Sequence, residues 1–227
     1  MDKALDVDAY AARWETAHPR DILAEVAGWG GHWTLAMSFQ REDTVILHWA
    51  TMVGLSFDVF WLDTDLLFSE TYAFYETVQS RYPVLWRRIR PALSLTDQAA
   101  QYGEALWQRD PHSCCFRRKV EPLFEALAGY DGWITGIRRE QSPTRAQAPI
   151  ISWDDRHGLY KLNPLATWTT GQVQAVTEDE GIPVHPLHSQ GYPSLGCAPC
   201  TRPTRPGESL RAGRWEGWDK FECGIHQ

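Results

Sequence analysis

Five cysteines constrain this chain more than any other feature, because their spacing is typical of a metal site and not of a disulfide scaffold. Cys114 and Cys115 are adjacent, Cys197 and Cys200 form a C-x-x-C motif, and Cys223 lies near the end of the chain. The number of cysteines is odd, and no basic-then-apolar segment opens the chain. We therefore expect no signal peptide, no disulfide framework and a cytoplasmic location.

Four of these thiols suit either zinc or an iron–sulfur cluster, since both take soft ligands. A structural zinc site usually draws on two spaced cysteine pairs, and adjacent cysteines close a mononuclear tetrahedron poorly. A cubane offers several irons, so neighbouring cysteines can each take a different one. The spacing favours a cluster over zinc. Two buried free thiols with a redox-active C-x-x-C remain the alternative, although this motif lies in a Gly- and Pro-rich loop (191–200) and not at the start of a helix.

Cys223 stands apart from the other four, in the segment 221–227, and chain ends are usually mobile and exposed. An incidental tail cysteine is one interpretation. The other is a nucleophile that a closing tail delivers to a pocket, and its thiolate then needs a neighbouring cation. Lys220, Arg211 and Arg214 are the candidates close to it in the sequence.

Apolar runs typical of strands alternate with helical patterns as far as about residue 181. We expect strands at 33–37, 57–62, 133–137, 149–153 and 159–162, and helices within 1–30, at 45–53, up to 82 and at 169–180. The early strands are apolar on both faces, which is typical of a mostly parallel sheet flanked by helices. We therefore expect an α/β fold with ligands at the carboxyl ends of strands, near Ser38, Asp63 and Arg138. From about Ile182 the periodicity fails and the chain becomes loop-rich.

The distribution of charge excludes some partners and suggests another. A net charge of −7, from 22 Lys and Arg against 29 Asp and Glu, argues against a nucleic-acid partner. The apolar runs fall short of the roughly 20 residues of a membrane helix, which argues against a membrane partner. Three basic clusters fit one anion site built from three loops, or three solvated faces. They are Arg117, Arg118 and Lys119, then Arg138, Arg139 and Arg145, then Arg211 and Arg214. Residues 38–43 add a helix N-terminus of the kind that binds phosphate.

Several blocks of sequence, taken together, resemble the assimilatory adenylyl-sulfate (APS) reductases of the sulfonucleotide (PAPS/APS) reductase family. The resemblance extends from about Leu35 to His226, and the blocks occur in the same order. They are Ser38-Phe39 with Glu42-Asp43, Leu62-Asp63-Thr64, Cys114-Cys115 with 118–123, and then 135–142, 163–165, 186–200, 211–215 and 222–226.

The resemblance implies a Rossmann-like adenine nucleotide α-hydrolase fold. We expect residues 1–181 to form an α/β nucleotide-binding domain, and 182–227 to form a cluster-binding loop and a catalytic tail of the same domain. The resemblance implies a 4Fe–4S cluster on Cys114, Cys115, Cys197 and Cys200. It also implies contacts to adenylyl sulfate from Ser38, Phe39, Asp63, Thr64, Lys119, Arg145, Arg211, Arg214 and Trp215.

The implied activity is the reduction of adenylyl sulfate to sulfite and AMP, in sulfate assimilation and cysteine biosynthesis. In this family the thiolate that matches Cys223 attacks the sulfur, AMP leaves, and an S-sulfocysteine remains. Reduced thioredoxin, or glutaredoxin, would then release sulfite. We also expect a homo-oligomer, and a solvated His226 in preference to one that assists Cys223.

Gln40 and Arg41 depart from the family pattern, because many members carry small residues there. The larger side chains leave open whether the 3′-phosphorylated substrate, PAPS, is reduced. The cluster cysteines favour adenylyl sulfate, since PAPS reductases typically lack them. A PAPS reductase and a non-catalytic iron–sulfur nucleotide-binding sensor stay as alternatives, although a sensor needs no terminal nucleophile. An ATP-pyrophosphatase of the tRNA-thiolation type should carry a Ser-Gly-Gly-x-Asp-Ser loop, which residues 38–43 do not match.

Overall fold

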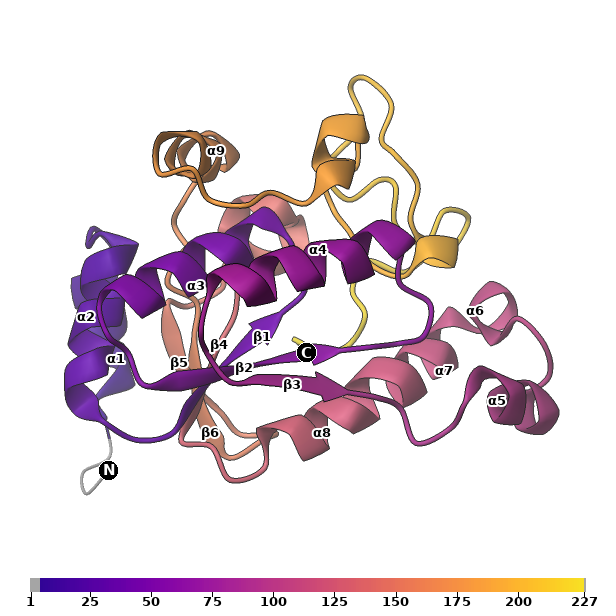
Figure 1. Cartoon of the computed structure of the whole chain (residues 1–227), viewed down its shortest axis with the longest axis horizontal. Coiled ribbons are helices and arrows are strands. Elements are labelled where there is room, and N and C mark those ends of the chain that lie inside the picture. Colours follow the sequence, from indigo (N-terminus) through magenta and orange to yellow (C-terminus); the bar gives the residue numbers. More distant parts are fainter. Residues whose placement is uncertain (1–4, 227) are drawn as a thin grey trace.

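The computed structural model describes residues 5–226, and within them six strands form one sheet in the order β3-β2-β1-β4-β6-β5 (Figure 1). Every neighbouring pair is parallel except β5 with β6, which is antiparallel at one edge. This confirms the expected mostly parallel sheet. The strands are β1 (Trp33–Met37), β2 (Phe57–Leu62), β3 (Trp86–Ile89), β4 (Gly132–Ile134), β5 (Ile151–Asp154) and β6 (Leu159–Leu162).

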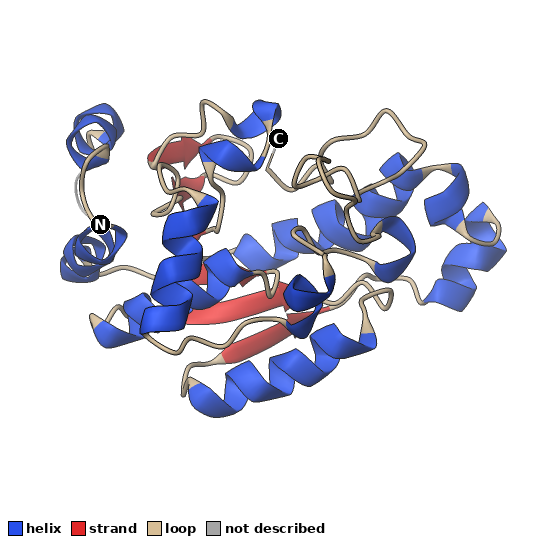
Figure 2. Cartoon of the chain, turned by 90° about the horizontal axis from the view of Figure 1, so that it is seen from above, coloured by secondary structure: helices blue, strands red, loops and turns tan. Residues whose placement is uncertain are grey.

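Helices cover both faces of the sheet, as Figure 1 and the view from above in Figure 2 show. The larger hydrophobic cluster packs α1 to α4 and α9 on one face, and a smaller cluster packs α8 on the other. The α-helices are α1 (Val7–Trp14), α2 (Pro19–Trp29), α3 (Arg41–Met52), α4 (Ser69–Arg81), α5 (Leu95–Tyr102), α6 (Leu106–Arg109), α7 (Pro111–Cys115), α8 (Glu121–Leu127) and α9 (Thr170–Asp179). A π-helical segment, Phe116–Val120, joins α7 to α8.

Successive side chains of β2 point to opposite faces of the sheet, so this one strand contributes to both hydrophobic clusters. Val59 and Trp61 belong to the larger cluster, whereas Phe60 between them belongs to the smaller cluster under α8. Trp49 and Trp133 are also fully buried. The tryptophans in the apolar runs therefore form core, as their sequence context indicates. No helix within residues 5–226 is long and apolar enough to cross a membrane.

The differences from the sequence expectations lie at element ends, at one edge of the sheet, and in the helices α5 and α6, which were not expected. β3 is missed because Arg87 and Arg88 occupy its middle, which is tolerated on an edge strand. The strand expected at 133–137 ends at Ile134, and the helix expected at 45–53 already begins at Arg41. The reciprocal capping box between Thr169 and Gln172 starts α9 as expected.

One short bridge ties the loop-rich C-terminal quarter to the loop after β2, and a second bridge lies within this quarter. Leu67 pairs with Cys197, and Thr201 pairs with Arg214. In Figure 1 this segment, drawn in orange to yellow, lies over the arrowhead ends of the central strands. The chain therefore brings its cysteine-bearing loop to the edge of the sheet where ligands bind in α/β folds.

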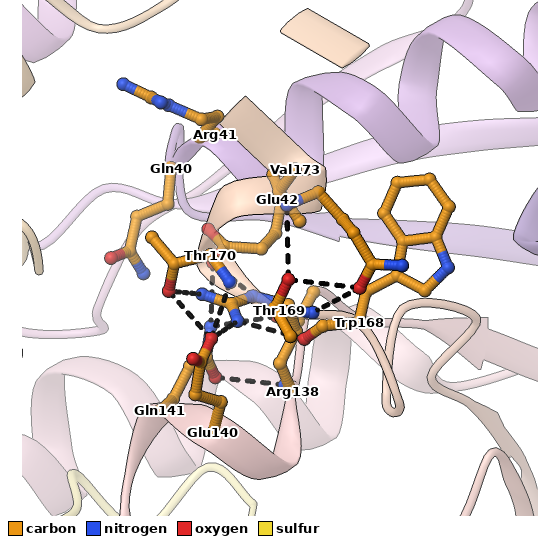
Figure 3. A network of polar contacts seen from close by, with 12 residues as sticks. Gln40, Arg41, Glu42, Arg138, Glu140, Gln141, Trp168, Thr169, Thr170 and Val173 are labelled. Atoms are coloured by element: carbon orange, nitrogen blue, oxygen red, sulfur yellow. Dashed lines mark hydrogen bonds and ion pairs between the residues drawn. The ribbon is translucent and has the colours of Figure 1, made fainter. Parts of the chain in front are cut away.

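A buried arginine just after β4 organises the same edge (Figure 3). Arg138 is 2% exposed. It donates to Glu42 Oε1 at 2.8 Å, to Glu140 Oε2 at 2.8 Å, to the Trp168 carbonyl at 3.0 Å and to Thr170 Oγ1 at 3.0 Å. These bonds join the loop after β4 to the first turns of α3 and α9.

The expectation that Arg138 and Arg139 belong to an anion site is therefore wrong. Arg138 forms ion pairs with the carboxylates of Glu42 and Glu140. Arg139 pairs with Glu15 through both of its terminal nitrogens. Sequence spacing suggested a cluster with Arg145, but a strand end scatters neighbouring side chains to different sides of the backbone. Each of these two arginines fastens the fold instead.

Arg138→Met should lower the free energy of unfolding by about 3–5 kcal/mol, because it leaves the buried carboxylate of Glu42 without its cation. Arg139→Met is the matched control: its side chain is 30% exposed and its partner Glu15 is 44% exposed, so the loss should be about 0–1 kcal/mol. Urea unfolding of both variants at one pH measures the difference. Equal losses would contradict the assignment.

Candidate active site

Two segments far apart in the sequence bring four cysteines to one cavity. Cys114 and Cys115 end α7, whose start is fixed by Pro111 and by Asp110, which accepts a bond from the Ser113 N–H. Cys197 and Cys200 flank a one-turn 3₁₀ helix in the C-terminal quarter. The residues that line the shared cavity are Leu66, Trp107, Pro111, Cys114, Cys115, Arg118, Lys119, Cys197, Cys200, Arg214 and Trp215.

Backbone contacts hold the C-x-x-C loop in this position. The Ala198 N–H donates to the Leu66 carbonyl at 2.7 Å, and the Trp215 N–H donates to the Cys200 carbonyl at 3.1 Å. Thr64 Oγ1 lies 3.2 Å from Cys197 Sγ. Thr64 therefore belongs to the surroundings of the cysteines.

Three of the four thiols are buried and Cys200 is half-buried, and this setting raises the pKa values of Cys114, Cys115 and Cys200. Burial, and then the charges of the neighbouring cysteines, raise the pKa of Cys114 to about 12 and the pKa of Cys200 to about 11. A bound metal centre would remove that penalty, because it binds the thiolate form. Within residues 5–226 no set of three or more Cys, His, Asp or Glu side chains has the geometry to hold a metal ion.

The donor set nevertheless fits a larger soft centre. Four thiols face one space, and the indole N–H groups of Trp107 and Trp215, which line it, have no hydrogen-bond partner among the described residues. Such donors can bond to sulfur. On the chemistry of the ligands, Cys114, Cys115, Cys197 and Cys200 could hold an iron–sulfur cluster.

A second cavity, which we call the inner cavity, opens beside the cysteines at the carboxyl ends of β1 and β4. The chain continues from β1 to β2 and β3 on one side and returns through β4 on the other, so this is the switch point of the sheet. Most of the sequence-predicted site residues line it, namely Ser38, Phe39, Lys119, Arg145, Arg211, Arg214, Trp215 and Cys223.

Asp63 and Thr64 are the predicted substrate contacts that do not line the inner cavity. Asp63 is fully buried and accepts hydrogen bonds from Tyr72 at 2.7 Å and from Arg88 at 2.8 Å. Both side chains therefore face structural partners. Both residues follow β2 and so lie at a strand end, as expected. The inner cavity, however, forms at the ends of β1 and β4.

The turn after β1 is built around a buried carboxylate. Asp43 accepts from the Ser38 N–H and from the Ser38 hydroxyl, both at 2.6 Å, and burial raises the pKa of Asp43 to about 7. Gly136 approaches so closely that a Cβ there would lie 2.3 Å from Asp43 Oδ1. Phe39 adopts a left-handed conformation (φ 63°) with its ring buried.

Gln40 is one of the two residues that depart from the family pattern. Its side-chain oxygen accepts a hydrogen bond from the Leu195 N–H at 3.1 Å and so connects this turn to the cysteine-bearing loop.

Glu222 holds the tail in the inner cavity. Its carboxylate, 8% exposed, accepts two bonds of 2.7 Å from Arg145 and one of 3.2 Å from Arg211. Thr144 Oγ1 adds a bond of 3.1 Å, and Arg156 binds the carbonyl of Gly224 at 3.1 Å. Arg145 and Arg211, predicted as substrate contacts, are thus occupied by the tail in this arrangement.

Two other cations act on Cys223. Burial raises the pKa of this thiol, but the charge of Lys119, a backbone bond from Ile225 and the charge of Arg214 together hold it below its ordinary value. Gly196 allows Arg214 to lie there, since a Cβ would come within 2.1 Å of its guanidinium. Lys119 is itself kept charged, because the neighbouring Cys197, Cys223 and Cys115 outweigh its burial and raise its pKa to about 12. The pKa of Cys223 is therefore shifted in the direction that favours a thiolate.

The expectation of a solvated His226 is wrong. Its ring stacks on Trp133 with centroids 5.6 Å apart and planes at 19°, and it lines the inner cavity. Burial, and the charges of Lys161, Arg145 and Arg211, hold the pKa of His226 well below its usual range. The imidazole is therefore neutral and a poor base.

Sequence reasoning missed four polar residues of the inner cavity or its tail. Glu42, Asp43 and Gln141 line the cavity, and Glu222 anchors the tail. The sequence could have indicated Glu222, because a carboxylate directly before a nucleophile on the tail is expected to bind a cation. Glu42, Asp43 and Gln141 lie in blocks that carry the family resemblance, but their place in the cavity follows from the arrangement of β1, β4 and α3 in space.

The sheet order, the switch-point cavity and its adjoining cysteines define an α/β protein of the adenine nucleotide α-hydrolase class. The family described as the phosphoadenosine phosphosulfate reductase domain matches residues 32–203, and the chain belongs to this family.

Curated relatives cover nearly the whole chain. It is 46% identical over 220 residues to a phosphoadenosine 5′-phosphosulfate reductase from Gloeobacter violaceus, covering 95% of this chain and 91% of that protein. It is 44% identical over 214 residues to an adenosine 5′-phosphosulfate reductase from Salinibacter ruber, covering 94% and 81%. A solved phosphoadenylyl-sulfate reductase from Candida auris, in a phosphate complex, has a TM-score of 0.78 at 24% identity and covers 89% of this chain and 100% of that one. This last likeness confirms the expected fold.

Lys119→Met should move the pH midpoint of Cys223 alkylation upward, because the largest stabilising charge on its thiolate is lost. Lys161→Met is the matched control, since Lys161 is a second buried lysine near the tail that acts on His226. Iodoacetamide labelling against pH, with the labelled peptide quantified by mass spectrometry, measures both. An unchanged midpoint in Lys119→Met would contradict the assigned activation.

Proposed function

We propose that this protein reduces adenosine 5′-phosphosulfate to sulfite and AMP, with Cys223 as the nucleophile. The observation that carries the proposal is an activated thiol, held by a buried ion pair, in the switch-point cavity of a sulfonucleotide reductase fold. Relatives named as reductases of the same nucleotide support it. The protein is thus an oxidoreductase that acts on a sulfonucleotide.

Residues 1–181 would bind the nucleotide, and 182–227 would supply the cysteine-bearing loop and the tail. Ser38 and Phe39 lie at the turn between β1 and α3, where free N–H groups and the helix dipole favour an anion. Lys119 and Arg214 would face the phosphosulfate. Arg145 and Arg211 would join them when the substrate competes with Glu222 for their guanidinium groups.

In the first step the Cys223 thiolate attacks the sulfur of the phosphosulfate. The bond from sulfur to the bridging oxygen breaks, AMP leaves, and the sulfur stays on Cys223 as an S-sulfocysteine. Negative charge accumulates on the sulfuryl and phosphate oxygens during this displacement. Lys119 and Arg214 lie ready to stabilise that charge without reorganisation. AMP is a good leaving group, so the low basicity of His226 is no obstacle.

In the second step a dithiol reductant of the thioredoxin or glutaredoxin type would remove the sulfo group. Its thiolate attacks Sγ of Cys223, sulfite leaves with the electrons of the S–S bond, and a mixed disulfide forms. The second thiol of the reductant then releases Cys223.

We also propose that Cys114, Cys115, Cys197 and Cys200 hold a 4Fe–4S cluster. Such a cluster would join the end of α7 to the C-terminal loop and place its charge next to Lys119. Lys119 lines both the cysteine cavity and the inner cavity, so one ammonium would feel the cluster and the substrate together.

Cys223→Ser should reduce sulfite formation by at least about a thousandfold while nucleotide affinity changes little, since a hydroxyl cannot replace an activated thiolate. A sulfite assay with adenosine 5′-phosphosulfate and reduced thioredoxin measures turnover, and calorimetry with AMP measures binding. Full turnover in the variant would refute the mechanism. A higher kcat/KM for the 3′-phosphorylated nucleotide would reassign the substrate.

Anaerobically purified protein should be brown and contain about four irons and four acid-labile sulfides per chain, as four cysteines in one cavity imply. Cys115→Ser should lose most of this iron, whereas Cys223→Ser should keep it. Metal analysis and the visible spectrum measure both. A colourless protein that contains zinc would refute the cluster.

A further inference from the structure

Cys223 lines two cavities, not one. Besides the inner cavity it borders a groove of about 550 Å³, which we call the outer groove. Ile225 and His226 line the inner cavity, whereas 219–222 and Gly224 line the outer groove, so the tail itself separates the two spaces. The other wall of the outer groove includes His112, Phe116 and Arg117 from α7 and the π-helical segment.

This arrangement meets a geometric demand of the second step in the proposed function, on which the inference rests. Displacement at a sulfur atom runs in line, so the attacking thiolate approaches Sγ opposite the bond that breaks. The sulfo group of an S-sulfocysteine would point into the inner cavity, towards Lys119 and Arg214. The approach opposite that bond then starts from the outer groove.

We propose that the outer groove is the docking site of the reductant, a small dithiol protein, and that its thiolate reaches Cys223 through this groove while the tail stays closed. The mixed disulfide forms on the outer face of Cys223. Sulfite departs into the inner cavity. The second thiolate of the reductant then attacks its own mixed-disulfide sulfur, which releases Cys223 as the thiolate and leaves the reductant oxidised.

The rim of the groove fits a protein better than a small thiol. Phe116 is 46% exposed and Phe221 is 66% exposed, and both stand at the groove. Exposed aromatic side chains around a reactive group are typical of protein interfaces. A small thiol would enter the groove without covering these rings.

The charge of the groove favours an anionic partner. Arg117, Arg156 and Lys220 line it together with Asp219 and Glu222. Glu222 is already neutralised by its two arginines on the inner side. With Glu222 neutralised, Arg117 and Lys220 together outweigh Asp219, and this positive charge attracts a thiolate and the acidic surface of a partner.

The test separates the two steps of the reaction. Protein mixed with adenosine 5′-phosphosulfate, without reductant, should release one equivalent of AMP and gain one SO₃ on Cys223. Reduced thioredoxin is then added and sulfite release is timed, with dithiothreitol as a parallel reductant. Phe116→Ser alters the rim, and Leu85→Ser is the matched control, because Leu85 is 66% exposed and lies outside the groove.

We expect all three proteins to give the same AMP burst. Sulfite release by thioredoxin should be about tenfold slower in Phe116→Ser, as for an interface anchor, and unchanged in Leu85→Ser. Release by dithiothreitol should be equal in all three. Wild-type release by thioredoxin in Phe116→Ser would overturn the proposal, as would an equal slowing with both reductants. An absent AMP burst in the wild type would instead refute the proposed function.

Discussion

The buried ion pairs of Glu222 hold together everything that the site requires. One carboxylate on the tail joins Arg145, which follows the loop after β4, to Arg211, which belongs to the C-terminal loops. Because both arginines and the carboxylate are largely withdrawn from water, breaking these bonds would leave uncompensated buried charges. The tail is thus closed by these ion pairs together with Ile225, which packs on the smaller hydrophobic cluster, and His226, which stacks on Trp133. Such a closure can be exchanged for an anionic substrate, whose phosphate and sulfate offer the same arginines equivalent partners.

The acidic chain separates its cations into two groups with different tasks. Arg118 and Arg138 are buried among carboxylates and carbonyls and serve the fold. Lys119 and Arg214 face thiols and a cavity and serve the chemistry. Arg118 and Lys119 are neighbours in the sequence, yet the π-helical segment turns one towards Asp65 and the other towards Cys223. Successive side chains of a helix point in different directions, so only one of these two adjacent cations acts on the nucleophile.

Local patterns in the sequence predict five of the six described strands of the sheet, and the family resemblance supplies most of the predicted residues of the inner cavity. Apolar strands, polar strand ends and the two cysteine pairs are readable from the chain, and the fold follows from their order. The misses have physical reasons. Asp63 and Thr64 do sit at a strand end, but the cavity forms at the switch point between β1 and β4, and strand order cannot be read from spacing. Arg138 binds Glu140, two residues along the chain, and the distant Glu42 on α3, whereas Arg139 binds the distant Glu15 at the end of α1. His226 is withdrawn from solvent because its ring stacks on Trp133, which lies in a strand distant in the sequence.

The central claim is that the tail thiol in the inner cavity accepts the sulfo group. Intact protein mixed with adenosine 5′-phosphosulfate in the absence of reductant, then digested without reduction, gives peptides whose masses locate the adduct. The account predicts one SO₃ per chain, on the peptide that contains Cys223. An adduct on one of the other four cysteines, or release of AMP and sulfite without any adduct, would contradict it.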